Sequence, residues 1–179
     1  MFLGSFFGEH GKALKIRNRE FLTRQGECDT RAFWLESGLL KATYVTEDGR
    51  EFVKSFFEEG SLLGSLRAQF EGIPNPFSLQ ALENCSLYAV DMLALRHKAA
   101  CDLTLSNALL EAMLALAIKK ERRELEFLTL SAEERYGQMI RCNPGLVQRI
   151  TQNDVARYLG ITPVALSRIR NRIRFKGFN

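Results

Sequence analysis

The sequence predicts an α+β protein built from three consecutive parts: a strand-rich N-terminal part, one long helix and a short helical C-terminal part. Turn signals recur about every 8–12 residues before the long helix, which is typical of a β-sandwich or barrel. Near Leu103 the apolar period changes from two residues to 3.6. Gly160 then separates two short amphipathic patterns close to the C-terminus. The predicted boundaries are 1–102, 103–130 and 131–179.

Length and composition indicate a folded chain of one domain or two small ones. The chain has 179 residues, of which 46% are hydrophobic and 26% charged, as in ordinary globular proteins. No apolar run reaches the roughly 18 residues that span a bilayer, and the start lacks the features of a signal peptide. We therefore expect a cytoplasmic protein with no membrane partner. Its cysteines have no CxxC spacing and are expected in the core or on the surface, without a metal: Cys28, Cys85, Cys101 and Cys142.

The charge is unevenly distributed along the chain. Residues 131–179 carry nine basic and three acidic residues, a balance of +6, whereas the remaining residues have a balance of −2. A basic C-terminal part on a weakly acidic body favours a nucleic-acid-binding module, although a solvated surface would give the same count.

The strand-rich part contains one clear hairpin. Two apolar stretches, Leu39–Val45 and Glu51–Phe57, flank Asp48 and Gly49, which supply the backbone conformation of a tight turn. A short helix over Ser65–Phe70 is predicted after a glycine-rich segment.

The long helix is predicted over Leu103–Leu128, a stretch without glycine or proline that would extend about 39 Å. Its apolar positions follow a 4–3 spacing, which is typical of a coiled-coil seam. We therefore expect a homodimer, the alternative being a core helix packed on its own β domain. The predicted dimer-helix residues are Leu109, Met113, Leu116 and Phe127.

The C-terminal part begins with two helix-start signals, at Ser131 and Thr151. Gly160 is predicted to end a short helix, and Thr162 to cap the next, with Pro163 at its first position. The second helix has an apolar stripe and an arginine-rich opposite face. Two short helices joined by a glycine turn predict a helix-turn-helix, rather than a purely structural hairpin.

The three parts, in this order, resemble the Crp/Fnr family of bacterial transcription regulators, which includes the cyclic-AMP receptor protein. The most specific likeness runs from Tyr158 to Arg170, near the family's recognition-helix pattern. The resemblance implies a β-roll (a double-stranded β-helix or jelly roll) of the cyclic-nucleotide-binding type, a long dimerisation helix, and a winged or helix-turn-helix domain. The N-terminal stretch Met1–Gly11 is expected to supply only a fragment of the helix that precedes the β-roll in relatives.

The resemblance also places the family's phosphate-binding cassette, which is degenerate here. Relatives that bind cyclic AMP carry a glutamate for the ribose and an arginine for the phosphate. Ser65 and Phe77 stand at those positions, and neither can replace the lost charge. Arg67 is expected to be solvated. We expect no gating by cyclic AMP and no resident cofactor, with an unidentified small molecule as the remaining effector of this pocket: Gly64, Ser65, Leu66, Phe77 and Ser78.

Arg168 keeps the family's later base-reading arginine, so we expect it to contact a guanine in the major groove. Val164 is expected to touch a thymine methyl group. Arg172 and Arg174 could equally offset the helix dipole. The full predicted DNA-binding set is Thr162, Pro163, Val164, Ser167, Arg168, Arg170, Asn171 and Arg174.

These features predict a homodimeric, sequence-specific regulator that binds double-stranded DNA, with RNA polymerase as a further partner. The alternative is a small-molecule or redox sensor whose DNA module is vestigial. An enzyme is not expected, because the chain has no phosphate-binding glycine loop and no nucleophile–base motif, and its two histidines, His10 and His97, lie far apart.

Overall fold

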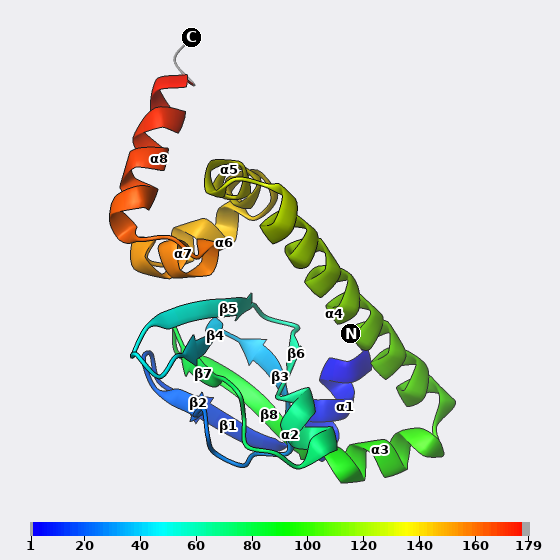
Figure 1. Cartoon of the computed structure of the whole chain (residues 1–179). Coiled ribbons are helices and arrows are strands. Elements are labelled where there is room, and N and C mark those ends of the chain that lie inside the picture. The colour runs from blue at the N-terminus through cyan, green and yellow to red at the C-terminus, as the bar shows by residue number, and fades with distance from the viewer. Residues whose placement is uncertain (1, 177–179) are drawn as a thin grey trace.

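The computed structural model describes residues 2–176, with side chains described through Ile173. Eight strands form two four-stranded antiparallel sheets, with strand orders β1-β8-β3-β6 and β2-β7-β4-β5. Figure 1 shows them as one layered unit beside the long helix α4 (Leu103–Thr129). The strands are β1 (Lys12–Ile16), β2 (Phe21–Thr23), β3 (Arg31–Ser37), β4 (Leu40–Val45), β5 (Glu51–Phe57), β6 (Leu62–Leu63), β7 (Ser78–Ala81) and β8 (Cys85–Asp91).

The predicted hairpin is confirmed, since β4 pairs antiparallel with β5 from Leu40 opposite Phe57 to Val45 opposite Glu51. Its turn contains Gly49 at φ 79°. The two sheets enclose a core of inward-facing side chains that includes Phe33, Leu35 and Phe77. The predicted short helix is also present, as α2 (Leu66–Glu71).

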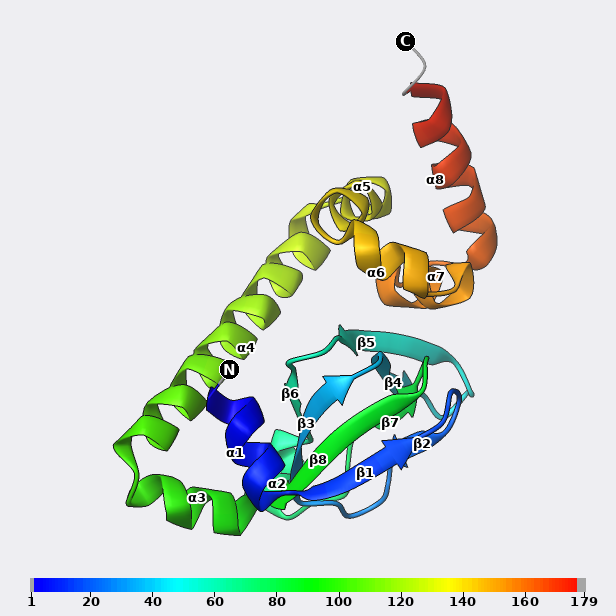
Figure 2. The same ribbon diagram turned by 180° about the vertical axis from the view of Figure 1, so that it is seen from behind.

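Three helices pack together at one side of the β-roll. They are α1 (Phe2–His10), α3 (Met92–Ala100) and α4 (Leu103–Thr129). Phe7 and Leu105 are fully buried in the cluster that these helices form against β3. Asp102 caps α4 by accepting a hydrogen bond from the backbone N–H of Leu105 at 3.0 Å. The cluster therefore fixes the base of α4 on its own β-roll, and Figure 2 shows α1 between the two.

Four further helices form the C-terminal module: α5 (Ala132–Cys142), α6 (Pro144–Arg149), α7 (Gln152–Leu159) and α8 (Pro163–Lys176). The predicted capping box at Ser131 and Glu134 is present. Helix α6 was not predicted from the sequence. Within residues 2–176 every strand belongs to the two N-terminal sheets, so the module is a helix-turn-helix without a wing in that range.

Candidate functional site

The junction between α7 and α8 has the geometry of a helix-turn-helix. Gly160 adopts φ 70° after α7 and donates its backbone N–H to the carbonyl of Ala156. This left-handed conformation is costly for any residue with a side chain. The hydroxyl of Thr162 then accepts a hydrogen bond from the N–H of Ala165 at 3.2 Å and caps α8. The turn is thus held from both sides by local bonds.

The apolar side of α8 packs into the module. Leu166 and Ile169 are buried against Val155, Ala156 and Leu159 of α7. Because these contacts fix the rotation of α8 about its axis, they also decide which of its residues face solvent.

The opposite side of α8 is exposed and basic. Val164 is 62% exposed at its first turn. Among the ion pairs of the described residues, none involves Arg168 or Arg170, whereas Arg172 pairs with Glu133 at 2.9 Å. The side chain of Arg174 lies outside the described residues. The structure brings the other predicted DNA-binding residues onto one exposed surface: Thr162, Pro163, Val164, Ser167, Arg168, Arg170 and Asn171.

The module is docked on the β-roll through α7. The ammonium of Lys41, on β4, lies 2.8 Å from Asp154 of α7 and 3.1 Å from Glu51 of β5. Both the Lys41 and Asp154 side chains are buried, at 7% and 6% exposure. Arg157 adds a second bond from α7 to Glu51 at 2.9 Å. In both ribbon views α7 lies over β5, while α8 extends away from the sheets (Figures 1 and 2).

A second set of ion pairs holds the other end of this interface. The guanidinium of Arg149 donates to Glu59 and to Glu83, each at 2.8 Å. These hydrogen bonds lower the pKa of the Glu59 carboxyl to about 2 and also lower the pKa of Glu83. Sequence reasoning did not find Lys41 or Arg149, since their partners are distant in the chain.

The predicted ligand-pocket residues are packed or hydrogen-bonded within the β-roll itself. Phe77 is buried in the core between the sheets. Ser65 is buried and caps α2, with Leu66 following as the first helical residue. Ser78 accepts a hydrogen bond from the N–H of Gln25 at 2.9 Å. Arg67 pairs with Glu71 on the surface.

At Gly64, whose φ is 147°, a Cβ atom would lie 2.4 Å from Nε2 of the Gln69 side chain. Thus cassette residues of this chain already contact other residues of the β-roll, and no cassette residue is itself a cation.

A lysine absent from the predicted set covers Phe77. The Lys54 ammonium lies 4.5 Å from the centre of the Phe77 ring, a cation–π distance. Burial lowers the pKa of Lys54 to about 8, and the charges of Lys120, Lys119 and Arg123 act in the same direction. The one sequence signal for a buried Lys54 is that it lies in a strand whose other residues are mostly apolar.

The predicted dimer-helix residues lie on a side of α4 that has neighbours in its own chain. Leu109 packs against the α1–α3 cluster, and Met113 is half-buried. Leu116 and Phe127 line a cavity with Lys54 and other β5 residues. Phe127 is nevertheless 41% exposed. The opposite face of α4 is more exposed and apolar, at 48% to 79% exposure: Leu103, Leu110, Leu114, Ile118, Leu125 and Leu128.

Two negative findings concern the described residues only. No helix among them is long and apolar enough to cross a membrane. No group of three or more metal-ligating side chains comes together in residues 2–176.

Comparison with known proteins agrees with this architecture. The cyclic nucleotide-binding domain family matches residues 13–100. An anaerobic regulatory protein of Haemophilus influenzae is 26% identical over 177 residues, covering 90% of this chain and 66% of the relative. The protein of the same name from Aggregatibacter actinomycetemcomitans is equally similar. The chain thus spans slightly less than two thirds of these relatives.

Solved structures share the fold across nearly the whole chain. FixK2 from Bradyrhizobium japonicum has a TM-score of 0.75 at 17% identity, covering 93% of this chain and 86% of its own. The c-di-GMP-responsive global regulator CLP of Xanthomonas campestris has a TM-score of 0.77 at 16% identity, covering 98% and 91%. Residues 13–100 therefore match the cyclic nucleotide-binding domain family, and the chain as a whole shares the fold of these regulators, as the resemblance to the Crp/Fnr family implies.

Proposed function

We propose that this protein is a homodimeric transcription regulator of the Crp/Fnr type that binds specific double-stranded DNA. The observation that carries the proposal is the exposed basic face of α8, which is presented by a capped helix-turn-helix. Unpaired arginines on an exposed helix attract the phosphate backbone of DNA, and the major groove admits one helix.

Within this face, Arg168 is assigned the sequence-reading role. A guanidinium can donate two hydrogen bonds to the edge of a guanine, a contact worth about 1–3 kcal/mol of discrimination. Val164 is assigned to a thymine methyl group. The remaining polar residues of the face position the helix by binding phosphates: Thr162, Ser167, Arg170, Asn171 and Arg174.

The dimer is proposed to form through the exposed apolar face of α4. Leu114, Ile118, Leu125 and Leu128 follow one another at spacings of four, seven and three residues, close to the 3.5-residue repeat of a coiled coil. The face lies opposite the side that contacts the β-roll. Residues 1–102 are then a sensor domain, 103–130 the dimer helix and 131–179 the DNA-binding domain.

The β-roll is proposed to act without cyclic AMP. None of the cassette residues is a cation that could pair with a buried cyclic phosphate, and Phe77 is part of the core. The nearby Lys54 ammonium lies over the Phe77 ring, and burial disfavours its charge. The protein is assigned no enzymatic activity, works in the cytoplasm where DNA is found, and contacts RNA polymerase when bound to a promoter.

The proposal is tested by fluorescence anisotropy of a random-sequence duplex at several salt concentrations. Wild-type binding is expected to weaken steeply with salt, and Arg170→Ala to reduce the slope of log K against log salt by about 0.9, the share of one phosphate contact. Arg96→Ala, which removes an arginine of α3 outside the module, is expected to leave the slope unchanged. Binding that is absent in wild type, or equally affected by both substitutions, contradicts the proposal.

A further inference from the structure

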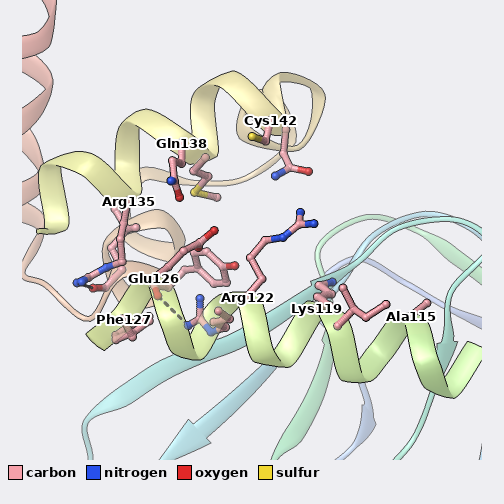
Figure 3. A pocket seen from close by; sticks show the side chains of 14 residues that line it. Ala115, Lys119, Arg122, Glu126, Phe127, Arg135, Gln138 and Cys142 are labelled. Atoms are coloured by element: carbon pink, nitrogen blue, oxygen red, sulfur yellow. Dashed lines mark hydrogen bonds between the residues drawn. The ribbon is translucent and has the colours of Figure 1, made fainter. Parts of the chain in front are cut away.

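A cavity of about 580 Å³ lies where the dimer helix meets the DNA module, away from the cassette of the β-roll. Its wall is formed by the C-terminal half of α4, by α5 and by the end of α7. Figure 3 shows Arg122 extending from α4 toward α5, and Gln138 extending from α5 toward α4. Side chains of α4 and α5 thus face each other across the cavity.

The charge around this cavity is strongly positive. Four cationic side chains line it, against the single carboxylate of Glu126: Lys119, Arg122, Arg123 and Arg135. None of the four belongs to an ion pair among the described residues. Burial lowers the pKa of Lys119, Glu58 opposes this effect, and Arg123 adds to it. Clustered cations without counter-charges are unfavourable, so the cavity favours an anion.

Some of these cations are held in place by backbone carbonyls. Arg123 donates to the carbonyl of Tyr158 at 3.0 Å, and Arg135 donates to those of Leu130 and Leu159 at 2.6 and 3.0 Å. Such bonds orient a guanidinium without neutralising its charge. The site is therefore preorganised, which reduces the entropy lost on binding.

Two polar atoms at the cavity are buried without a hydrogen-bond partner: Nε of Arg135 and Oε1 of Gln138. A buried donor or acceptor without a partner is costly. A neutral molecule such as water would leave the cationic charge of the cavity uncompensated. A ligand that carries negative charge compensates the cations, and a small rotation of the Arg135 or Gln138 side chain would give these atoms a partner on it.

We propose that this cavity binds a small polyanion bearing phosphate or carboxylate groups. The anion would lie between Arg122 on α4 and Gln138 on α5, beside Arg135. It would thereby connect the dimer helix to the module that carries α8. Binding itself does not depend on the DNA-binding function proposed above.

The test is calorimetric titration of the full chain with inorganic pyrophosphate, and in parallel with citrate to separate phosphate from carboxylate recognition. At least one of the two anions is expected to bind saturably, with one site per chain. Arg122→Gln should weaken that binding by about tenfold, the effect of losing ~1.4 kcal/mol of charge-assisted contact. Arg122 is exposed and belongs to none of the ion pairs among the described side chains, so the variant should fold normally.

Gln138→Leu removes the orphan acceptor without changing charge, and is expected to weaken the same binding. Arg141→Gln is the matched control, because Arg141 is an exposed arginine of α5 outside this cavity. No saturable binding of either anion to wild type overturns the proposal. If Arg141→Gln weakens anion binding as much as Arg122→Gln does, the proposal is also overturned. The same holds if Arg122→Gln weakens binding of a DNA duplex but leaves anion binding unchanged. A wild-type protein that binds the anion but no DNA would contradict the proposed function and leave this proposal standing.

Discussion

At the scale of single residues, the buried charge of Lys41 is compensated by two acidic partners. Its ammonium is buried between Asp154 and Glu51, so two chain segments supply the charges that compensate it. A buried ion pair adds little stability over apolar packing, but breaking it leaves a buried charge without a partner. The pair thus makes the docked position of α7 specific.

Lys41→Met should lower the free energy of unfolding by about 3 kcal/mol, at the lower end for a broken buried pair, because Asp154 keeps the Thr151 hydroxyl at 2.6 Å. Urea denaturation measures this change. Lys12→Met, at an exposed position of β1, is the matched control and should have an effect near zero. Similar stabilities for the two variants would show that Lys41 does not hold the interface.

Sequence reasoning succeeded for residues whose partners are local. The caps at Ser131, Thr151 and Thr162 bond to groups three residues away, so a pattern of neighbours was sufficient to predict them. Lys41 and Asp154 are separated by 113 positions. Their pairing depends on how the module docks, which no local pattern records.

At the scale of elements, α4 shows where periodicity is ambiguous. Apolar residues follow helical spacing on two of its sides, one through Leu109 and Leu116 and one through Leu114 and Leu125. The position of α1 and α3 against β3 decides which side is covered. The spacing thus predicted the helix correctly, but not which face is left exposed. Helix α6 was missed because six residues are too few to establish a period.

If the exposed face of α4 forms the dimer, Leu114→Glu should shift the protein toward monomers without unfolding it, since a charge at a coiled-coil seam opposes association. Sedimentation velocity measures the shift. Leu93→Glu makes the same chemical change at an exposed leucine of α3. That control should leave the mass unchanged, and equal behaviour of the two variants would place the interface elsewhere.

The end of α7 depends on the conformation of Gly160. Gly160→Ala should destabilise the protein by about 1–2 kcal/mol, because φ is 70° while the nearest side chain, Phe127, leaves room for a methyl group at 3.5 Å. Gly145→Ala, within α6 and free of nearby atoms, should be neutral or stabilising. Thermal unfolding of both variants tests this opposite sign, and a Gly160→Ala protein as stable as wild type would contradict it.

At the scale of the whole molecule, the C-terminal module and the β-roll share one apolar cluster. Leu39, Val53 and Phe56 from the sheets pack with Tyr136, Val155 and other residues of the module. Ion pairs lie on both sides of this cluster. The exposed face of α8 is thus carried by a module whose position is set by the β-roll.

Acid should weaken the Arg149 end of this interface. The Glu59 carboxyl has its pKa lowered from 4.5 to about 2 by Arg149, so the stabilisation is fully present above about pH 4.5 and is lost as pH falls toward 2. Arg149→Met should therefore be less stable than wild type by a constant amount above pH 4.5. Urea denaturation at successive pH values should show this difference shrinking below that point. A difference that stays constant down to pH 2 would contradict the assignment.

The central claim, that the α8 face of a dimer reads DNA sequence, is tested most directly by selecting duplexes from a random pool with purified protein and no added effector. We expect enrichment of a two-fold symmetric sequence with half-sites about one helical turn apart, and loss of a guanine preference in Arg168→Ala. A folded, dimeric wild-type protein that enriches no sequence, or an Arg168→Ala protein that selects the same sequence, would contradict the claim.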